Sequence, residues 1–148
     1  MAHPWVAPAD AIVAEINAAS LTVSDLEAKR KYQGPSGKRN THTYSCRVCP
    51  NPEDFFSPTK QDRAYSYTEN LNLIVWLERR ILMDDSKVGG QLDEVLSVFQ
   101  EIVDLLSDGD KWAGWSLQEY GTLTYDDERI WSSGVFQGQI QLNLRRVV

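Results

Sequence analysis

The chain has 148 residues, of which 42% are hydrophobic and 24% charged, and its net charge at pH 7 is −6. This length and composition predict one globular domain, residues 1–148, that can bury a core without disulfides or metal ions. The acidic balance argues against non-specific binding to nucleic acid and against docking on anionic membranes, since both require clustered Lys and Arg.

No apolar run approaches the roughly 20 residues that a membrane-spanning helix needs. The longest, residues 71–77, is interrupted by Asn72. The N-terminus, residues 1–5, lacks the basic and apolar regions of a secretion signal. We therefore expect a protein that stays in the cytoplasm of the cell that makes it, where Cys46 and Cys49 remain reduced thiols.

The first third of the chain predicts a helix and then a strand. Residues 1–8 contain two Pro and predict an irregular lead-in. Residues 10–19 predict a short helix, because their Ile and Val side chains fall on one stripe. In residues 26–32 the hydrophobic period changes to two, which predicts a half-buried strand with Ala28 and Tyr32 on its apolar face.

A turn and a second strand follow. Residues 33–40 are rich in Gly, Pro and basic side chains, and they predict a mobile hairpin tip that carries Lys38 and Arg39. Residues 42–49 alternate again and predict a strand that ends before Pro50, because Pro cannot donate to a ladder.

Residues 51–63 predict a long loop with two adjacent aromatic residues, Phe55 and Phe56. Such a pair either packs under the fold or is exposed for a partner. Residues 65–77 predict the longest strand, polar on one face at its start and apolar on both faces at its end. A further loop is expected at 84–90.

Residues 92–106 predict a helix most clearly. Their apolar side chains recur at positions i, i+3, i+4 and i+7, which lie on one face of a helix. Residues 115–125 predict a strand, residues 126–129 a turn, and residues 135–145 a closing half-buried strand. The sequence therefore predicts an α+β domain with a largely antiparallel sheet of about five strands. Two helices cover one face, in the order helix, three strands, helix, two strands.

The strongest candidate for a functional site is a possible zinc site made by His42, Cys46 and Cys49. These three residues are close in sequence, and His and Cys are good zinc ligands. A structural zinc site usually needs four ligands, and on a strand Cys49 points away from the other two. A redox pair would need a Cys at a helix N-terminus, whereas this pair ends a strand.

The acidic pairs at 84–85 and 126–128 lie in expected turns, where solvated charge is normal. We therefore expect no catalytic residue, metal or cofactor.

The element order and several segments resemble the tail terminator (tail completion) proteins of long-tailed bacteriophages, the lambda-type minor tail family. The segments that carry the likeness are Ala11–Ile16, Tyr44–Pro50 with the Pro-rich loop after it, Tyr67–Leu77, Leu92–Leu106 and Gly134–Leu142. The resemblance covers about residues 9 to 146. It is one of pattern, because the family has no catalytic motif to compare.

The resemblance implies a structural virion protein of the tail or neck. It would form a homo-hexameric ring that caps the tail tube, ends tube polymerisation and offers a joining surface to the head connector. DNA would pass through the lumen without being read. The candidate contacts with neighbouring subunits or the tail tube are Lys38, Arg39, Phe55, Phe56, Pro58, Arg63 and Trp131. The candidate lumen or solvated face is Gln137, Gln139, Gln141 and Asn143.

Two alternatives stay open. A neck or head-completion protein of the same kind of particle would share the ring but sit on the portal side. A small ligand-binding domain or enzyme of the α+β class would need a pocket with convergent polar groups.

Overall fold

The computed structural model describes residues 2–35, 43–63, 66–84, 86–108 and 111–148. Within these ranges the chain forms three helices and one mixed sheet of eight strands, so the α+β class is confirmed and the expected count of elements is too low. The helices are α1 (Val6–Ala18), α2 (Val88–Ser107) and α3 (Asp127–Ser133). The strands are β1 (Glu27–Arg30), β2 (Ser45–Pro50), β3 (Phe56–Arg63), β4 (Ser66–Arg80), β5 (Lys111–Trp112), β6 (Trp115–Tyr120), β7 (Thr124–Tyr125) and β8 (Val135–Val147).

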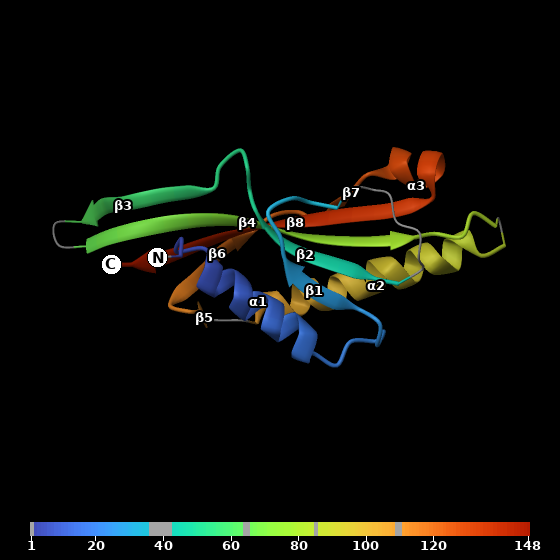
Figure 1. Cartoon of the computed structure of the whole chain (residues 1–148), viewed down its shortest axis with the longest axis horizontal. Coiled ribbons are helices and arrows are strands. Elements are labelled where there is room, and N and C mark those ends of the chain that lie inside the picture. The colour runs from blue at the N-terminus through green and yellow to red at the C-terminus, as the bar shows by residue number, and fades with distance from the viewer. Residues whose placement is uncertain (1, 36–42, 64–65, 85, 109–110) are drawn as a thin grey trace.

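The sheet is built on the antiparallel pair β4 and β8. Their register runs without a shift from Thr68 opposite Val147 to Arg80 opposite Val135. The free edge of β4 receives β3 along its first half and β2 along its second half. The free edge of β8 receives β6 and β7 in the same way, while β1 and β5 extend the sheet outward. Figure 1 shows this β4–β8 ribbon along the whole length of the molecule.

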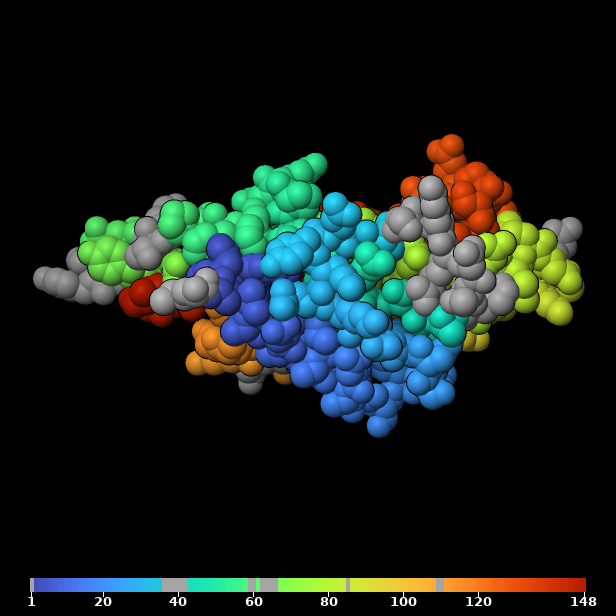
Figure 2. Space-filling view, in the orientation of Figure 1, coloured from blue at the N-terminus to red at the C-terminus, as the bar shows by residue number. Residues whose placement is uncertain are grey.

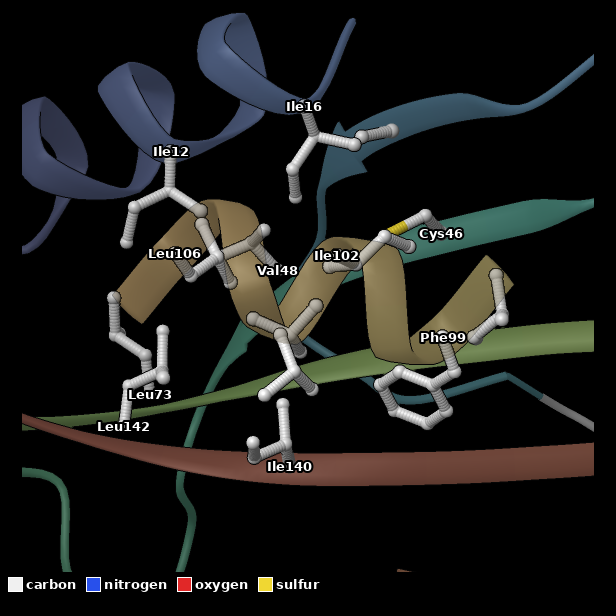
Figure 3. Packing of buried hydrophobic residues seen from close by; sticks show 14 of the residues in the cluster. Ile12, Ile16, Cys46, Val48, Leu73, Phe99, Ile102, Leu106, Ile140 and Leu142 are labelled. Carbon is white, nitrogen blue, oxygen red and sulfur yellow. The ribbon is translucent and has the colours of Figure 1, made fainter. Parts of the chain in front are cut away.

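One face of the ribbon forms the core, because alternate side chains on both strands are apolar. Figure 3 shows these side chains meeting Ile12 and Ile16 from α1 and Phe99, Ile102 and Leu106 from α2. The buried ribbon residues are Leu71, Leu73, Val75, Leu77, Phe136, Ile140, Leu142 and Leu144. Both helices lie on the same side of the sheet, as expected (Figure 1). The expected half-buried closing strand is confirmed as β8.

The N-terminal lead-in is shorter than expected. Helix α1 begins at Val6, and Trp5 and Pro8 are buried against the core. The expected irregular lead-in is therefore confirmed for residues 2–5 and wrong for residues 6–8, because Trp5 brings enough apolar surface to anchor the first helical turn. The strand expected at 26–32 ends at Arg30. Tyr32, expected on its apolar face, is 69% exposed.

The hairpin expected around 33–40 is wrong. Strands β1 and β2 are parallel, with Ala28 opposite Cys46, so a hairpin turn cannot join them. A parallel pair needs a connection of about a dozen residues or more, and residues 31–44 lie between the two strands. Lys38 and Arg39 lie outside the described residues.

The expected long loop at 51–63 contains strand β3, which pairs with the start of β4. The strand tolerates Pro58 for two reasons. Among the described residues β3 pairs with a strand on one edge only, and two register shifts interrupt that ladder. Likewise the expected loop at 84–90 ends early, since α2 begins at Val88 and takes Gly89 and Gly90 into its first turn.

The strand expected at 115–125 is divided into β6 and β7, and the turn expected at 126–129 is the start of helix α3. The side chain of Asp126 accepts a hydrogen bond from the backbone N–H of Arg129 at 3.1 Å and so caps the helix. Gly134, with φ of 66°, ends it in the left-handed conformation that glycine adopts without strain. The N-cap, the acidic first turn and this glycine are all helix signals in the sequence.

The outer edge of β1 is closed by a side chain. The amide of Asn17, near the end of α1, accepts from the backbone N–H of Ala28 at 2.8 Å and donates to the carbonyl of Ala28 at 3.0 Å. These are the backbone groups that a further strand would use. Asn17 thus attaches α1 to the sheet and also blocks edge-to-edge pairing at this position.

Replacing Asn17 with Ala removes both hydrogen bonds, so we expect the free energy of unfolding to fall by about 1–2 kcal/mol. Asn17→Asp keeps the acceptor but sets a carboxylate against the Ala28 carbonyl, and we expect it to be destabilised as well. Urea denaturation measures both, with Ser20→Ala, an exposed change after the helix, as the control. An unchanged midpoint in Asn17→Ala would contradict the role given to this amide.

Candidate functional site

The face of the sheet that points away from α1 and α2 carries a row of amides. Gln137, Gln139, Gln141 and Asn143 alternate with the core residues of β8. Gln141 is exposed and the other three are half-buried. The row extends onto β4, where Asn72 accepts a hydrogen bond of 2.8 Å from Asn143. The residues proposed from sequence as one solvated face therefore do lie together on one face.

A groove of about 370 Å³ opens on this polar face. Its floor includes Ile74 and Trp76 of β4 together with Gln139 and Gln141 of β8. One wall is the segment 32–34 and the other is the segment 50–53. The expectation that the strand at 65–77 becomes apolar on both faces at its end fits Ile74, which is only 6% exposed although it points away from the helices. Strand β4 does not stop there, however, and its last three residues, Glu78, Arg79 and Arg80, are charged.

Residues 33–35, which we call the strap, pass over the Trp76 indole and supply part of the first wall of this groove. Gly34 lies so close to the indole of Trp76 that a Cβ atom there would be 2.8 Å from Cε2. Gln137 donates to the carbonyl of Pro35 at 2.8 Å, and the Cys49 thiol donates to the carbonyl of Gln33 at 3.2 Å. These bonds hold the strap on the polar face, where sequence analysis expected a free tip.

The two Cys point to opposite faces of β2, as expected. Cys46 lies in the core and Cys49 lies under the strap, and both are free thiols. Burial raises the pKa of Cys46 to about 12, and burial, partly offset by Arg47, raises that of Cys49 to about 11. In the described part of the chain no three His, Cys, Asp or Glu side chains gather into a group that could hold a metal ion. His42 lies outside the described residues.

A second titratable cluster joins β4 to α2. The hydroxyl of Tyr44 donates to Glu94 at 2.8 Å, and the guanidinium of Arg79 lies over the Tyr44 ring and 3.2 Å from the same carboxylate. Burial is the largest cause that raises the pKa of Tyr44, followed by its bond to Glu94. Each group has a protein partner, and the cluster fixes the helix to the sheet.

Phe55 and Phe56 pack against the hydrophobic core from its edge. The His3 ring lies 5.1 Å from Phe55 and 5.0 Å from Phe56 between ring centres, and Trp5 meets Phe55 edge-on at 5.9 Å. Both Phe are half-buried. The N-terminal residues thus form an aromatic cluster with them, a contact that sequence analysis missed because the lead-in was taken as irregular. Their proposed contact with a partner stays a prediction.

The remaining candidates occupy scattered positions. Pro58 is exposed on β3, and Arg63 lies at the end of that strand, with its side chain outside the described part. Trp131 projects from α3 and is 59% exposed. The structure therefore brings the amide row together, but it does not bring Phe55, Phe56, Pro58 and Trp131, the candidate contacts whose side chains it describes, into one site.

No protein-family model matches the chain, and no curated protein is significantly similar to it. No helix in the described ranges combines the length and hydropathy that crossing a membrane requires.

The strap yields a direct test. Replacing Gly34 with Val forces the strap or the Trp76 indole to move, so we expect the free energy of unfolding to fall by about 1–3 kcal/mol, as for other overpacked sites. Gly90→Ala is the matched control, because no atom lies within 4 Å of its Cβ and Ala favours a helix. Urea denaturation measures both; equal stability of Gly34→Val and the wild type would show that the strap is not seated on Trp76.

The thiols give a pH test. In the unfolded chain they ionise near pH 9, whereas the folded protein keeps Cys49 protonated to about pH 11. Protons are thus lost first from the unfolded state, and stability should fall as pH rises from about 9 towards 11. Each thiol contributes at most about 1.4 kcal/mol per pH unit. Chemical denaturation at successive pH values should show a shallower fall in Cys49→Ala than in the wild type; parallel curves would contradict the burial of this thiol.

Proposed function

We propose that this chain is a structural virion protein that resembles phage tail terminators. It assembles into a ring that caps the tail tube, ends tube polymerisation and provides the surface for head–tail joining. The observation that carries the proposal is the row of uncharged amides on β8, on a sheet whose opposite face is buried under α1 and α2.

The amide row suits a wall along which DNA slides. Strong binding of DNA depends on Lys and Arg that displace counterions from phosphates. Gln139, Gln141 and Asn143 offer hydrogen bonds that water replaces readily, and they carry no charge. A lumen lined by such side chains lets DNA pass without holding it.

The helix layer supports the same orientation. Helices α1 and α2 contain acidic residues and no Lys or Arg. A surface of this kind repels DNA phosphates, so the helices belong on the outside of a ring and the amide row on the inside. The proposed orientation therefore follows from charge as well as from the position of the core.

A ligand-binding domain is the second candidate, and the groove over Trp76 is the observation that favours it. The groove combines an indole and an Ile with amide side chains, which is the composition of many small-molecule sites. It predicts that a small ligand raises the melting temperature of an isolated monomer, whereas the ring proposal predicts a higher-order species without any ligand.

Electron microscopy tests the main proposal. We expect the purified protein to form closed rings and, when mixed with tail tubes of its particle, to bind one end of each tube. Added to polymerising tube protein, it should shorten the tubes. Binding to DNA-filled heads and not to tubes would support the neck alternative, and a protein that binds neither would end the proposal.

A further inference from the structure

The strap, residues 33–35, lies where two hollows of the polar face meet. The first is the groove of about 370 Å³ described above, and Gly34 belongs to its wall. The second is a hollow of about 240 Å³ beside β7, with Gln137 in its lining. Trp76 and Gln139 line both hollows, and the strap passes over the Trp76 indole. The strap therefore covers a residue that the two hollows share.

The strap is attached to the sheet by side chains of its neighbours. Gln137 donates to the carbonyl of Pro35 at 2.8 Å, a normal hydrogen-bond length. Arg47 lies 3.4 Å from each of the other two strap carbonyls, which is longer than usual. The Cys49 thiol, a weak donor, lies 3.2 Å from the first of them. In the described part of the chain no backbone-to-backbone hydrogen bond joins the strap to a strand, so only one of these attachments has ordinary strength.

The chain just before the strap is held more firmly. The backbone N–H of Lys31 donates to the carbonyl of Val48 at 3.0 Å and continues the pairing of β1 with β2. The Tyr32 ring meets Trp5 edge-on at 5.3 Å between ring centres. The type of attachment thus changes after Tyr32, from ladder and ring contacts to side-chain bonds. A segment with few and weak contacts opens at a lower free energy than the core, so the strap is placed to open first.

Opening of the strap changes the surface that the polar face presents. Trp76 is half-buried and Cys49 is buried, and both lie on the face that points away from α1 and α2. Lifting the strap uncovers the indole and removes the acceptor of the Cys49 thiol. It also lets the two hollows join over Trp76, beside the amide side chains of Gln137 and Gln139.

We propose that the strap is a hinged cover, which lifts from Trp76 as a unit while the rest of the fold stays intact and so controls access to the space over the indole. A ligand that contacts the covered part of the indole binds only the open state. Its apparent affinity is therefore reduced by the fraction of chains that are open. The cover belongs to a single chain, so it goes beyond ring assembly and does not depend on it.

Alkylation by iodoacetamide measures the opening, because the chain contains two thiols, Cys46 and Cys49. Cys46 lies in the core and reacts when the protein unfolds, whereas Cys49 reacts whenever the strap lifts. Trypsin cuts after Arg47 and so separates the two thiols for mass spectrometry. We expect Cys49 of the native protein to react at least about ten times faster than Cys46. Low urea concentrations should accelerate only Cys46, because opening of the strap exposes little surface.

Gln137→Ala tests the attachment. It removes the one strap bond of ordinary length, so we expect the rate at Cys49 to rise about five- to tenfold relative to the rate at Cys46, the effect of losing one hydrogen bond. Gln139→Ala is the matched control. It removes the same side chain from the next position on this face of β8, and Gln139 makes no side-chain hydrogen bond with the described residues. The ratio of the two rates should stay at the wild-type value in this control.

The inference is overturned if the two thiols react at equal rates that both rise with urea, since the strap would then open only when the whole protein unfolds. It also fails if Cys49 reacts fast but at the same rate in Gln137→Ala, because the reagent would then reach the thiol without any movement of the strap. An equal rise in Gln137→Ala and Gln139→Ala would show that the bond to Pro35 is not what holds the cover. All of these measurements are made on dilute protein, so none depends on ring formation.

Discussion

The long register between β4 and β8 is the constraint on which the rest of the structure depends. These two strands share one ladder over their whole common length, and every other strand pairs with one of their free edges or with a strand that does. Because side chains alternate along a strand, this single register decides which residues face α1 and α2 and which form the amide row. A slip by one residue would bury Gln139 and Gln141 and expose Ile140 and Leu142. Figure 2 shows the elongated body that results, with α3 and the 50–55 segment projecting from the same side.

The elements with strong periodicity were predictable, and those fixed by tertiary contacts were not. The alternation in residues 135–145 and the stripe in residues 92–106 predicted β8 and α2, because both signals come from burial of one face. Helix α3 was missed although Asp126 and Gly134 mark its ends, since a helix of seven residues is not stable alone and its segment was interpreted as a turn. The parallel pairing of β1 with β2 leaves no local signal, because a crossover and a long hairpin loop have the same composition.

The candidate site was predicted in part. The four amides on β8 were identified as one face, and Trp131 was named as a candidate contact. The strap over Trp76 was missed because nothing near Gly34 indicates that the chain returns to the sheet.

The β4–β8 pairing also has a consequence for the order of events during synthesis. A strand near residue 70 must wait for its partner near residue 140, so the ribbon is a contact of high sequence separation, and folding dominated by such contacts is slow. Until the last part of the chain leaves the ribosome, β4 exposes a hydrophobic edge that can pair with strands of other nascent chains. Slow translation of the final segment would therefore lengthen the period in which aggregation competes with folding.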